Sequence, residues 1–363
     1  MEFIKNGAAL LNAKIAAAAE DQDSGRTLTV TGNYEIEDTV ILPSRFTLFL
    51  EDAHLRMADG TFCNMFRNEG AGRSDAGSPD REIRILGRGR AVLDGGTYNG
   101  LCEHNSEKDG RPHISVNNLI LMANVEGFQL EGLHLRNQRW WAIDLLWCRK
   151  GLLRDIDFLA DDRHVTESGA LEPYLSHEGG GYGACHIHNA DGIDLRCGCR
   201  DILIEHVTGF TQDDTVALTG LQGRLEAMYR PAGDGVENDI CNVTVRDVNC
   251  EAFCSNIRLL NQGGVKLYNI LIDGMTDSSK GSAHMDRGIC GVRIGDNHLY
   301  GSRHSTFDET FGITVRNVFS RAHTALRLAG CIDGLTVENV RGFDGCEMRI
   351  ENDAQLKNAA GLD

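Results

Sequence analysis

Proline is scarce in this chain: 363 residues contain 5 Pro beside 42 Gly. Linkers between domains are usually exposed stretches rich in proline, glycine or polar residues, and we find no stretch of this kind in the sequence. Many glycines with few prolines instead indicate many tight turns within one regular architecture. We therefore expect a single domain over residues 1–363.

The chain also lacks a basic excess and a long apolar run. Its 36 Lys and Arg against 53 Asp and Glu leave a net charge of −17, which argues against a nucleic-acid partner because phosphate binding needs clustered cations. An acidic sugar is not excluded, since local positive charge can coexist with a negative total. No apolar run approaches about 18 residues, so we expect no membrane span. The N-terminus reads Met1-Glu-Phe-Ile-Lys-Asn-Gly7 without a charged-then-apolar leader, which favours a cytoplasmic location.

Twelve cysteines in a chain without a leader favour reduced thiols over disulfides. Cys197, Cys199, Cys241, Cys250 and Cys254 recur beside strand-like segments, where we expect small, buried, apolar side chains. Cys197-Gly-Cys199 could bind a metal, but no second pair with zinc-type spacing follows it. We therefore expect no metal and no cofactor, and the oligomeric state stays open.

A short phrase returns along the chain, in which a Gly, Asn or Asp precedes alternating apolar residues. Its copies are Gly132-Leu-His-Leu, Asp201-Ile-Leu-Ile, Asn242-Val-Thr-Val, Asn269-Ile-Leu-Ile, Gly312-Ile-Thr-Val and Gly334-Leu-Thr-Val. Period-two alternation over four residues indicates a short strand with one buried face. The small residue before it suits a sharp turn with positive φ.

A second phrase interleaves with the first. Its copies are Ala142-Ile-Asp-Leu, Gly192-Ile-Asp-Leu, Thr215-Val-Ala-Leu, Asn256-Ile-Arg-Leu, Gly291-Val-Arg-Ile, Ala325-Leu-Arg-Leu and Glu347-Met-Arg-Ile. Ile193 to Val216 spans 23 residues, and the 50 residues from Ile143 to Ile193 would fit two turns of such a repeat. Longer gaps carry polar stretches, which we interpret as loops inserted on one side of a regular coil.

A period of about 22 to 25 residues with two or three short strands predicts an all-β fold, a single-stranded right-handed parallel β-helix. A leucine-rich repeat would show a Leu and Asn framework, and a sandwich would show hairpin signals; the first is absent and the second are scarce. Residues 7–20 form a helix pattern, which we expect to cap the open solenoid end within residues 1–25. Coils are expected over 26–350, with a C-terminal tail at 351–363.

Three carboxylates gather on two neighbouring coils of this predicted helix. Successive coils lie about 4.8 Å apart, so one repeat position forms a ladder along the surface. The residue two before the first apolar position of the second phrase is Asp191 in one coil and Asp214 in the next, and Asp213 precedes Asp214. A single Asp is common in turns, but a ladder of like charges costs energy. Inverting glycoside hydrolysis needs such a group, because one acid protonates the leaving oxygen and another carboxylate activates water.

The motifs around these residues resemble those of glycoside hydrolase family 28, the polygalacturonases and relatives with a pectin-lyase-like β-helix. Asn189-Ala-Asp191-Gly-Ile-Asp194 is similar to the family's Asn-Thr-Asp motif, and Gln212-Asp213-Asp214-Thr-Val-Ala-Leu is similar to its Gly-Asp-Asp motif. The resemblance covers roughly residues 120–345.

The resemblance implies roles for the matched residues. Asp213 would be the general acid, and Asp191 and Asp214 would position and deprotonate the attacking water. The other polar residues of the two motifs become candidates for substrate binding; they are Asn189, Asp194 and Gln212.

Two departures from the family pattern concern the substrate. The family's Gly-His-Gly motif, usually one coil later, is replaced by Gly233-Asp-Gly-Val-Glu-Asn, which lacks the histidine. Its Arg-Ile-Lys motif, which contacts the sugar carboxylate, appears as Arg258-Leu-Leu, which keeps the arginine and loses the lysine. We therefore expect a family-28-like hydrolase whose substrate differs from plain polygalacturonate. His188, next to the first motif, is the first candidate to replace the histidine, followed by His177 and His186; ordinary loop or strand-surface histidines are the commoner alternative.

The residue between the two apolar positions of the second phrase gives a further row: Asp144, Asp194, Ala217, Arg258, Arg293, Arg327 and Arg349. If the apolar pair points inward, this row points outward and changes from acidic to basic across the catalytic coils. Arginine suits bidentate binding of carboxylate or sulfate, so Arg258 and Arg293 are candidate contacts to an anionic substrate. A solvated strand face is an equal alternative.

Aromatic residues and inserted loops are expected to shape the substrate groove. Trp141 precedes the Asp191 coil and could stack on a sugar ring, although a packed tryptophan is at least as common. Loops at 161–182 and 222–239 flank the aspartates and are expected to form walls, because loops on rigid scaffolds usually carry specificity.

Other functions remain open alongside hydrolysis. A polysaccharide lyase shares this architecture and commonly uses Ca²⁺, which three aspartates could bind through oxygen ligands. Epimerisation and glycosyl transfer also occur on β-helices, and a non-catalytic carbohydrate-binding solenoid gains support from the missing histidine. Each alternative has a carbohydrate partner. The sugar, its linkage, and endo or exo action are left open.

Overall fold

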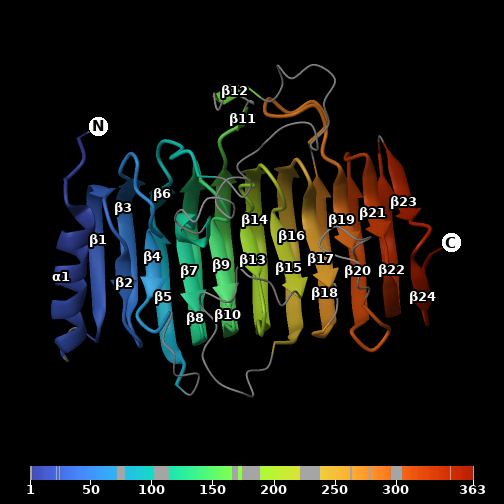
Figure 1. Cartoon of the computed structure of the whole chain (residues 1–363), viewed down its shortest axis with the longest axis horizontal. Helices are drawn as coiled ribbons and strands as arrows, with labels where there is room; N and C mark the ends of the chain where they lie inside the picture. Colours follow the sequence, from blue (N-terminus) through green and yellow to red (C-terminus); the bar gives the residue numbers. More distant parts are fainter. Residues whose placement is uncertain are drawn as a thin grey trace.

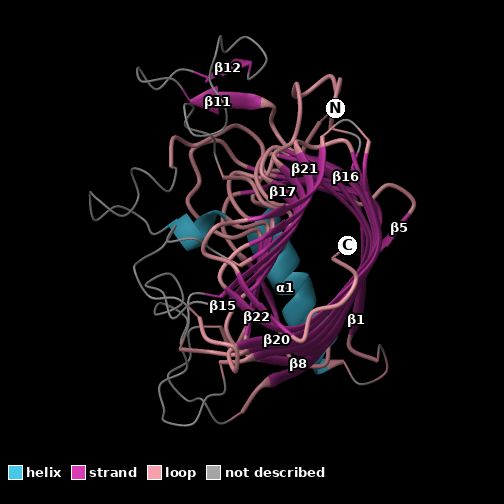
Figure 2. Ribbon diagram, turned by 90° about the vertical axis from the view of Figure 1, so that its right-hand side faces the viewer, coloured by secondary structure: helices cyan, strands magenta, loops and turns pink. Residues whose placement is uncertain are grey.

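Two long parallel sheets carry most of the chain and wind it into a right-handed parallel β-helix (Figures 1 and 2). The computed structural model describes residues 2–21, 23, 25–71, 78–101, 114–165, 171–173, 189–220, 238–261, 264–277, 279–295, 305–343 and 345–362. Within them lie one α-helix, α1 (Gly7–Glu20), and one 3₁₀ turn at Ile114–Asn117.

The twelve-stranded sheet comprises β1 (Thr27–Ile36), β3 (Thr47–Met57), β5 (Asp80–Arg88), β6 (Val92–Asp94), β8 (Val125–Arg136), β10 (Arg149–Leu159), β14 (Arg200–Thr211), β16 (Ile240–Ala252), β18 (Leu267–Asp277), β20 (Thr310–Ser320), β22 (Cys331–Gly342) and β24 (Gln355–Lys357). The ten-stranded sheet comprises β2 (Val40–Leu42), β4 (Phe66–Asn68), β7 (Ile120–Ala123), β9 (Ile143–Leu146), β13 (Ile193–Leu195), β15 (Val216–Gly220), β17 (Ser255–Asn261), β19 (Cys290–Ile294), β21 (Thr324–Leu328) and β23 (Cys346–Ile350). A separate antiparallel pair, β11 (Arg163–Val165) and β12 (Leu171–Pro173), lies above one edge of the coil (Figure 1).

The second sequence phrase forms the ten-stranded sheet in the predicted register. Ile193 pairs with Ile143 on one side and with Val216 on the other, and the row continues through the following strands. The prediction of two turns between Ile143 and Ile193 is wrong, because β9 and β13 are adjacent strands. The intervening chain is one coil with a long insertion, which includes β11 and β12.

The first phrase forms part of the twelve-stranded sheet, and its small residues form a corner with positive φ. The φ angles are 57° at Asp201, 54° at Asn242 and 64° at Gly312. Side-chain amides stack along this corner, where the Asn242 amide donates to Asp201 Oδ1 at 2.8 Å. The copy at Gly132 is out of register with the others, since Leu133 pairs with Ile156 in the row that also contains Val207.

A continuous apolar core fills the coil, and α1 covers its N-terminal end, as predicted (Figure 1). The alanine-rich sequence favours a helix, and Ala8, Leu11 and Ile15 bury their side chains against Val30 and other residues of the first coil. At the other end, the residues expected as a tail include β24, which pairs with β22 and extends the sheet.

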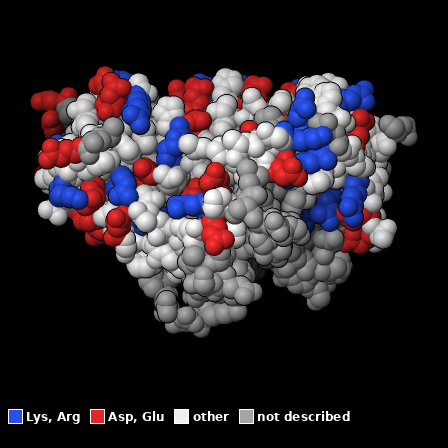
Figure 3. All heavy atoms as spheres, turned by 90° about the horizontal axis from the view of Figure 1, so that it is seen from above, with Lys and Arg blue, Asp and Glu red and all other residues white. Residues whose placement is uncertain are grey.

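The cysteines and charges agree with the sequence expectations where the structure describes them. The ten described cysteines are free, and all five that were expected to be buried, Cys197, Cys199, Cys241, Cys250 and Cys254, are buried. No described helix has the length and apolar character needed to cross a membrane. On the face in Figure 3, acidic and basic residues of the described part are interspersed, so the negative net charge does not form a single patch there.

The spacing of the coils depends on Gly192, which follows Asp191. A Cβ atom at this position would lie 2.4 Å from the carbonyl oxygen of Thr215 in the next coil and 3.1 Å from the Phe158 ring. Backbone cannot move away without separating the two strands, so a side chain here is not tolerated at the native spacing.

We expect Gly192→Ala to lower the free energy of unfolding by about 1–3 kcal/mol, the usual cost of overpacking, measured by urea denaturation. Gly220→Ala is the control, because its Cβ would first meet the side chains of Val265 and Asn261 and not backbone. Equal losses in the two variants would contradict the assigned role of Gly192.

Candidate active site

Backbone hydrogen bonds between adjacent coils bring Asp191 next to Asp214. Gly192 N donates to the carbonyl oxygen of Asp214 at 2.9 Å, and Ile193 N donates to that of Thr215 at 2.9 Å. Thr215 N in turn donates to the carbonyl oxygen of Ser255 at 3.0 Å, which connects a third coil. The two-rung arrangement predicted from the repeat is therefore present in the structure.

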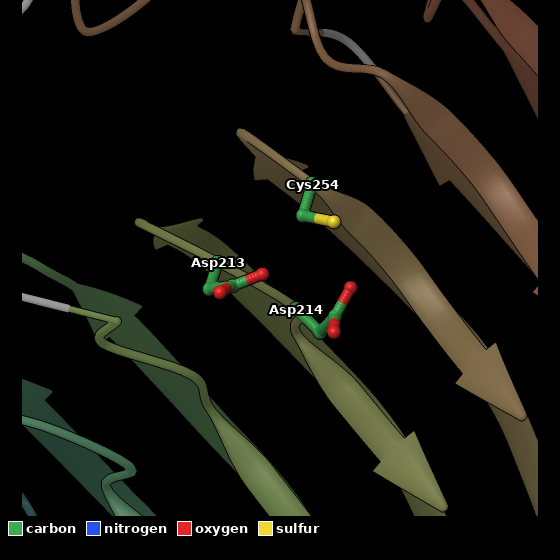
Figure 4. Close-up of side chains that lie close together, drawn as sticks. All are labelled: Asp213, Asp214 and Cys254. Atoms are coloured by element: carbon green, nitrogen blue, oxygen red, sulfur yellow. The ribbon is translucent and has the colours of Figure 1, made fainter. Parts of the chain in front are cut away.

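Asp213, Asp214 and Cys254 lie side by side where the chain enters β15 and β17 (Figure 4). One oxygen of each carboxylate and the Cys254 sulfur all lie within 4.8 Å of one another, and all three residues are buried. Burial raises the pKa of the Cys254 thiol well above its ordinary value, and the charges of Asp214 and Asp213 raise it further. The thiol is therefore neutral at neutral pH.

Arg258 provides the positive charge of the cluster. Its Nε lies 2.9 Å from Asp214 Oδ2, and both side chains are almost fully buried. Buried ion pairs of this kind are costly to break, because the remaining charge is left without compensation. The structure thus brings together Asp213, Asp214 and Arg258, all expected in the site.

Among the described residues, the cluster offers fewer oxygen ligands than the Ca²⁺ ion of a lyase would take. Calcium takes six to eight oxygen ligands, whereas this cluster offers two carboxylates and a thiol. Asp214 also already forms an ion pair with Arg258. A thiol with carboxylates is closer to the donor set of zinc, but a cation there would have to compete with the guanidinium.

Burial makes ionisation of the surrounding carboxyl groups difficult. The pKa of Asp191 is raised well above its ordinary value by burial and then by the charges of Asp194, Asp213 and Asp214. The pKa of Asp194 is raised in the same way, by burial and then by Asp144, its partner in the adjacent strand. Among the described residues neither oxygen of Asp194 has a hydrogen-bond partner. Burial and the neighbouring carboxylates therefore both favour the protonated form of Asp194, as is usual for clustered carboxyl groups.

The remaining motif residues have different surroundings. Asn189 is half-buried and has a φ of 56°. We expected Gln212 to bind substrate, but its amide nitrogen donates to the carbonyl oxygens of Asp161 and Arg163, at 2.7 and 2.6 Å. This side chain therefore anchors the insertion that precedes β13.

Several expected residues lie outside the described part of the chain. They are His177, His186, His188 and most of the Gly233-Asp-Gly-Val-Glu-Asn segment, with much of the loops at 161–182 and 222–239. The register also shows that the coil after Asp214 presents Ser255 at the equivalent position, since Val216 pairs with Ile257. Gly233 itself lies outside the described residues, so its comparison with the Gly-His-Gly motif stays a prediction.

The outward row has the predicted order, with one revision to its exposure. Asp194, Ala217, Arg258 and Arg293 pair successively across four strands, but the acidic end is buried and not solvated. At the basic end Arg327 and Arg349 both pair with Glu351, with Nε–Oε1 distances of 2.6 and 2.9 Å. Within the described residues Arg293 has neither a hydrogen bond nor an ion pair.

Trp141 is a packed residue in this structure. Its ring stacks on Trp140 with centroids 3.9 Å apart, and the Arg196 guanidinium lies 4.7 Å from its centroid. Both tryptophans are buried. The alternative of a packed aromatic is therefore the one observed.

Two residues of the cluster were missed from the sequence. Cys254 was interpreted only as a small apolar side chain, and Ser255 was not considered. The signal was available, because the rule that selects Asp191 and Asp214 selects Ser255 when applied to the next copy of the phrase.

Comparisons with known proteins give structural but not sequence relatives. No protein-family model matches the chain, and no curated protein matches it. An exopolygalacturonase from Thermotoga maritima has a TM-score of 0.53 at 14% identity, covering 97% of this chain and 87% of its own. What it shares with this chain is the fold.

Two further solved structures show the same likeness. An endo-xylogalacturonan hydrolase from Aspergillus tubingensis has a TM-score of 0.51 at 12% identity, covering 99% of this chain and 96% of its own. A 1,3-alpha-1,4-beta-D-galactose-4-sulfate-3,6-anhydro-D-galactose-2-sulfate 4 galactohydrolase has a TM-score of 0.53 at 12% identity, covering 97% and 89%. The parallel β-helix is common to all three.

We expect Asp194→Asn to stabilise the protein at pH 7. Folding raises the pKa of the Asp194 carboxyl group above 3.8, its ordinary value in the unfolded chain. The free energy of unfolding therefore falls as the pH rises from about 3.8 toward the pKa of the folded protein. Each pKa unit corresponds to about 1.4 kcal/mol, so the gain should be at least about 1 kcal/mol at pH 7 and vanish below about pH 4. Thermal melting at both pH values measures it, with the exposed Asp286→Asn as control. A gain independent of pH would contradict the assignment.

Proposed function

We propose that this protein is a glycoside hydrolase that cleaves an anionic, uronic-acid-containing or sulfated, poly- or oligosaccharide by an inverting acid/base mechanism. The observation that carries the proposal is the set of buried carboxyl groups on two adjacent coils, Asp191, Asp213 and Asp214, with Arg258 on the third. The family resemblance of their motifs and the shared fold of the three hydrolases support it.

The chemistry divides between the carboxyl groups. Asp213 protonates the glycosidic oxygen as the bond to the leaving sugar breaks, while Asp191 and Asp214 orient a water and accept its proton on the opposite face. The raised pKa of Asp191 favours a cluster that shares a proton before substrate binds. The proposal requires that this shared proton reside on Asp213 when the leaving oxygen is in place.

Arg293 is the proposed contact for the negative charge of the substrate. It follows Arg258 in the outward row, is half-buried, and makes no direct ion pair within the described residues, although the charge of Asp214 still acts on it and raises its pKa. A guanidinium can bind a carboxylate or sulfate through two parallel hydrogen bonds. Arg327 and Arg349 are less suited, because both already pair with the carboxylate of Glu351.

We expect Asp213→Asn to lower kcat by about 10³-fold, the contribution typical of a general acid, while substrate binding is retained. Release of reducing ends from polygalacturonate, xylogalacturonan and sulfated galactans measures it, with Asp286→Asn as the unaffected control. An unsaturated, ultraviolet-absorbing product would indicate a lyase. Binding without cleavage by the unmodified protein on every polymer would indicate a carbohydrate-binding solenoid.

We expect Arg293→Ala to raise KM by about tenfold with kcat nearly unchanged, because it removes an interaction made equally in the ground and transition states. Steady-state kinetics on the anionic polymer that is cleaved measures it. Arg349→Ala, at the end of the row that pairs with Glu351, is the matched control. Unchanged kinetics in Arg293→Ala would show that the arginine row is a solvated strand face.

A further inference from the structure

A second concave site lies at the opposite ends of the strands from the aspartates. A cavity of about 470 Å³ is lined by Lys266, Phe307, Asp308, Phe311, Gly312, Asp333 and Gly334. β17 begins at Ser255, beside the aspartate rung, and ends at Asn261, whose amide donates to the carbonyl oxygen of Glu309 at 2.9 Å. Seven strand residues span roughly 20 Å, so one sugar cannot touch both sites.

The cavity adjoins a row of aromatic rings on the outside of the coil. Tyr268 and Phe311 are neighbours in register on β18 and β20, and their rings stack with centroids 4.9 Å apart and planes 9° apart. The next residues in the row are Asp333 and Lys357. Phe311 lines the cavity, and Tyr268, which does not, covers the face of the Phe311 ring toward β18.

Phe307 and two glycines, Gly312 and Gly334, complete the apolar lining of the cavity. Phe307 is half-buried, and its ring lies 5.8 Å from the Lys357 ammonium. Gly312 and Gly334 both have a φ of 64° and add no side chain to the cavity. A flat ligand can therefore approach the backbone between the aromatic rings. Rings on an outer strand face are not needed for the core, which lies inside the coil.

The polar rim carries both signs of charge in fixed positions. Asp308 accepts a hydrogen bond from Thr306 Oγ1 at 2.6 Å, and Asp333 accepts one from the Asn358 amide at 2.8 Å and pairs with Lys357 at 3.3 Å. These bonds lower the pKa of both carboxyl groups, so they are ionised acceptors. Lys266 in the lining and Lys357, which pairs with Asp333 from outside the lining, together balance the charges of the two carboxylates.

We propose that this cavity is a second carbohydrate site, which binds a neutral sugar ring stacked on Phe311 and flanked by Phe307. The C–H face of a sugar suits an aromatic ring, its hydroxyls suit fixed carboxylate acceptors and an ammonium donor, and balanced charge disfavours an anionic sugar. The volume lies within the range of small-ligand pockets. The site does not depend on the aspartates being catalytic. If they are, it holds a second segment of the same polymer and raises the effective concentration of substrate.

Affinity electrophoresis in native gels containing galactomannan, xyloglucan or arabinogalactan tests the proposal, with polygalacturonate as the anionic comparison. We expect at least one neutral polymer to retard the protein, and Phe311→Ala and Phe307→Ala each to weaken that binding roughly fivefold, the order expected for losing one aromatic stacking contact. Phe343→Ala is the matched control, because Phe343 is 62% exposed and stacks on Phe319, away from the cavity. Thermal melting confirms that each variant is folded.

Two results would overturn the proposal: no retardation by any neutral polymer, or equal retardation of the unmodified protein and both cavity variants. Asp213→Asn should bind the neutral polymer like the unmodified protein, and loss of its binding would place the site at the aspartates instead. The binding experiment is independent of the cleavage assay. If the protein proves not to be a hydrolase, the expected difference in retardation between the unmodified protein and the cavity variants stays the same.

Discussion

The parallel pairing of β13, β15 and β17 is the constraint on which the rest of the site depends. Each carboxyl group is placed by main-chain hydrogen bonds between neighbouring strands, and its position follows from its place in the repeat. Such pairing fixes the distance between coils at about 4.8 Å. Side-chain packing alone could shift by fractions of an ångström, whereas a ladder can change register only by whole residues, which would turn every side chain to the other face.

This rigidity allows the chain to keep an arrangement that is unfavourable by itself. Asp144, Asp191, Asp194 and Asp214 are buried together, where Arg258 pairs with Asp214 and the pKa values of Asp191 and Asp194 are raised. Outside a rigid scaffold, such carboxyl groups would move apart and stay ionised in water, because burying an uncompensated charge is costly. Here the strands belong to sheets that run along an apolar core from the first coil to the last. The stability of this core offsets the unfavourable free energy of burying the carboxyl groups. Stability is commonly lost in this way where function needs strained or charged groups.

Local patterns in the sequence predicted most of the fold, and tertiary relationships account for the errors. The alanine-rich helix ends where expected, because helix formation depends on neighbours within a few residues. The apolar pairs of the second phrase pair with one another, because each copy occupies the same position in the repeat. The copy at Gly132 was assigned to the wrong row because the coil has two similar corners. The 50-residue interval between Ile143 and Ile193 was read as two turns because spacing does not distinguish an added coil from an insertion. In the site, the aspartates followed from the repeat, but the fixed partners of Gln212 and Trp141 did not.

The anchoring of Gln212 has a consequence for how such a protein can diversify. This residue directly precedes Asp213, and its amide grips the two carbonyl groups at the root of the insertion that contains β11 and β12. The root of the insertion is thus fastened to the peptide that presents the Asp213 carboxyl group, while the strand ladder beneath is held by its own main-chain hydrogen bonds. Replacement of this segment by one of different length and composition would leave the carboxyl cluster in place, provided that the new segment kept two carbonyl groups within hydrogen-bond distance of the Gln212 amide. The β-helix coils would then stay constant while the inserted segments could be replaced.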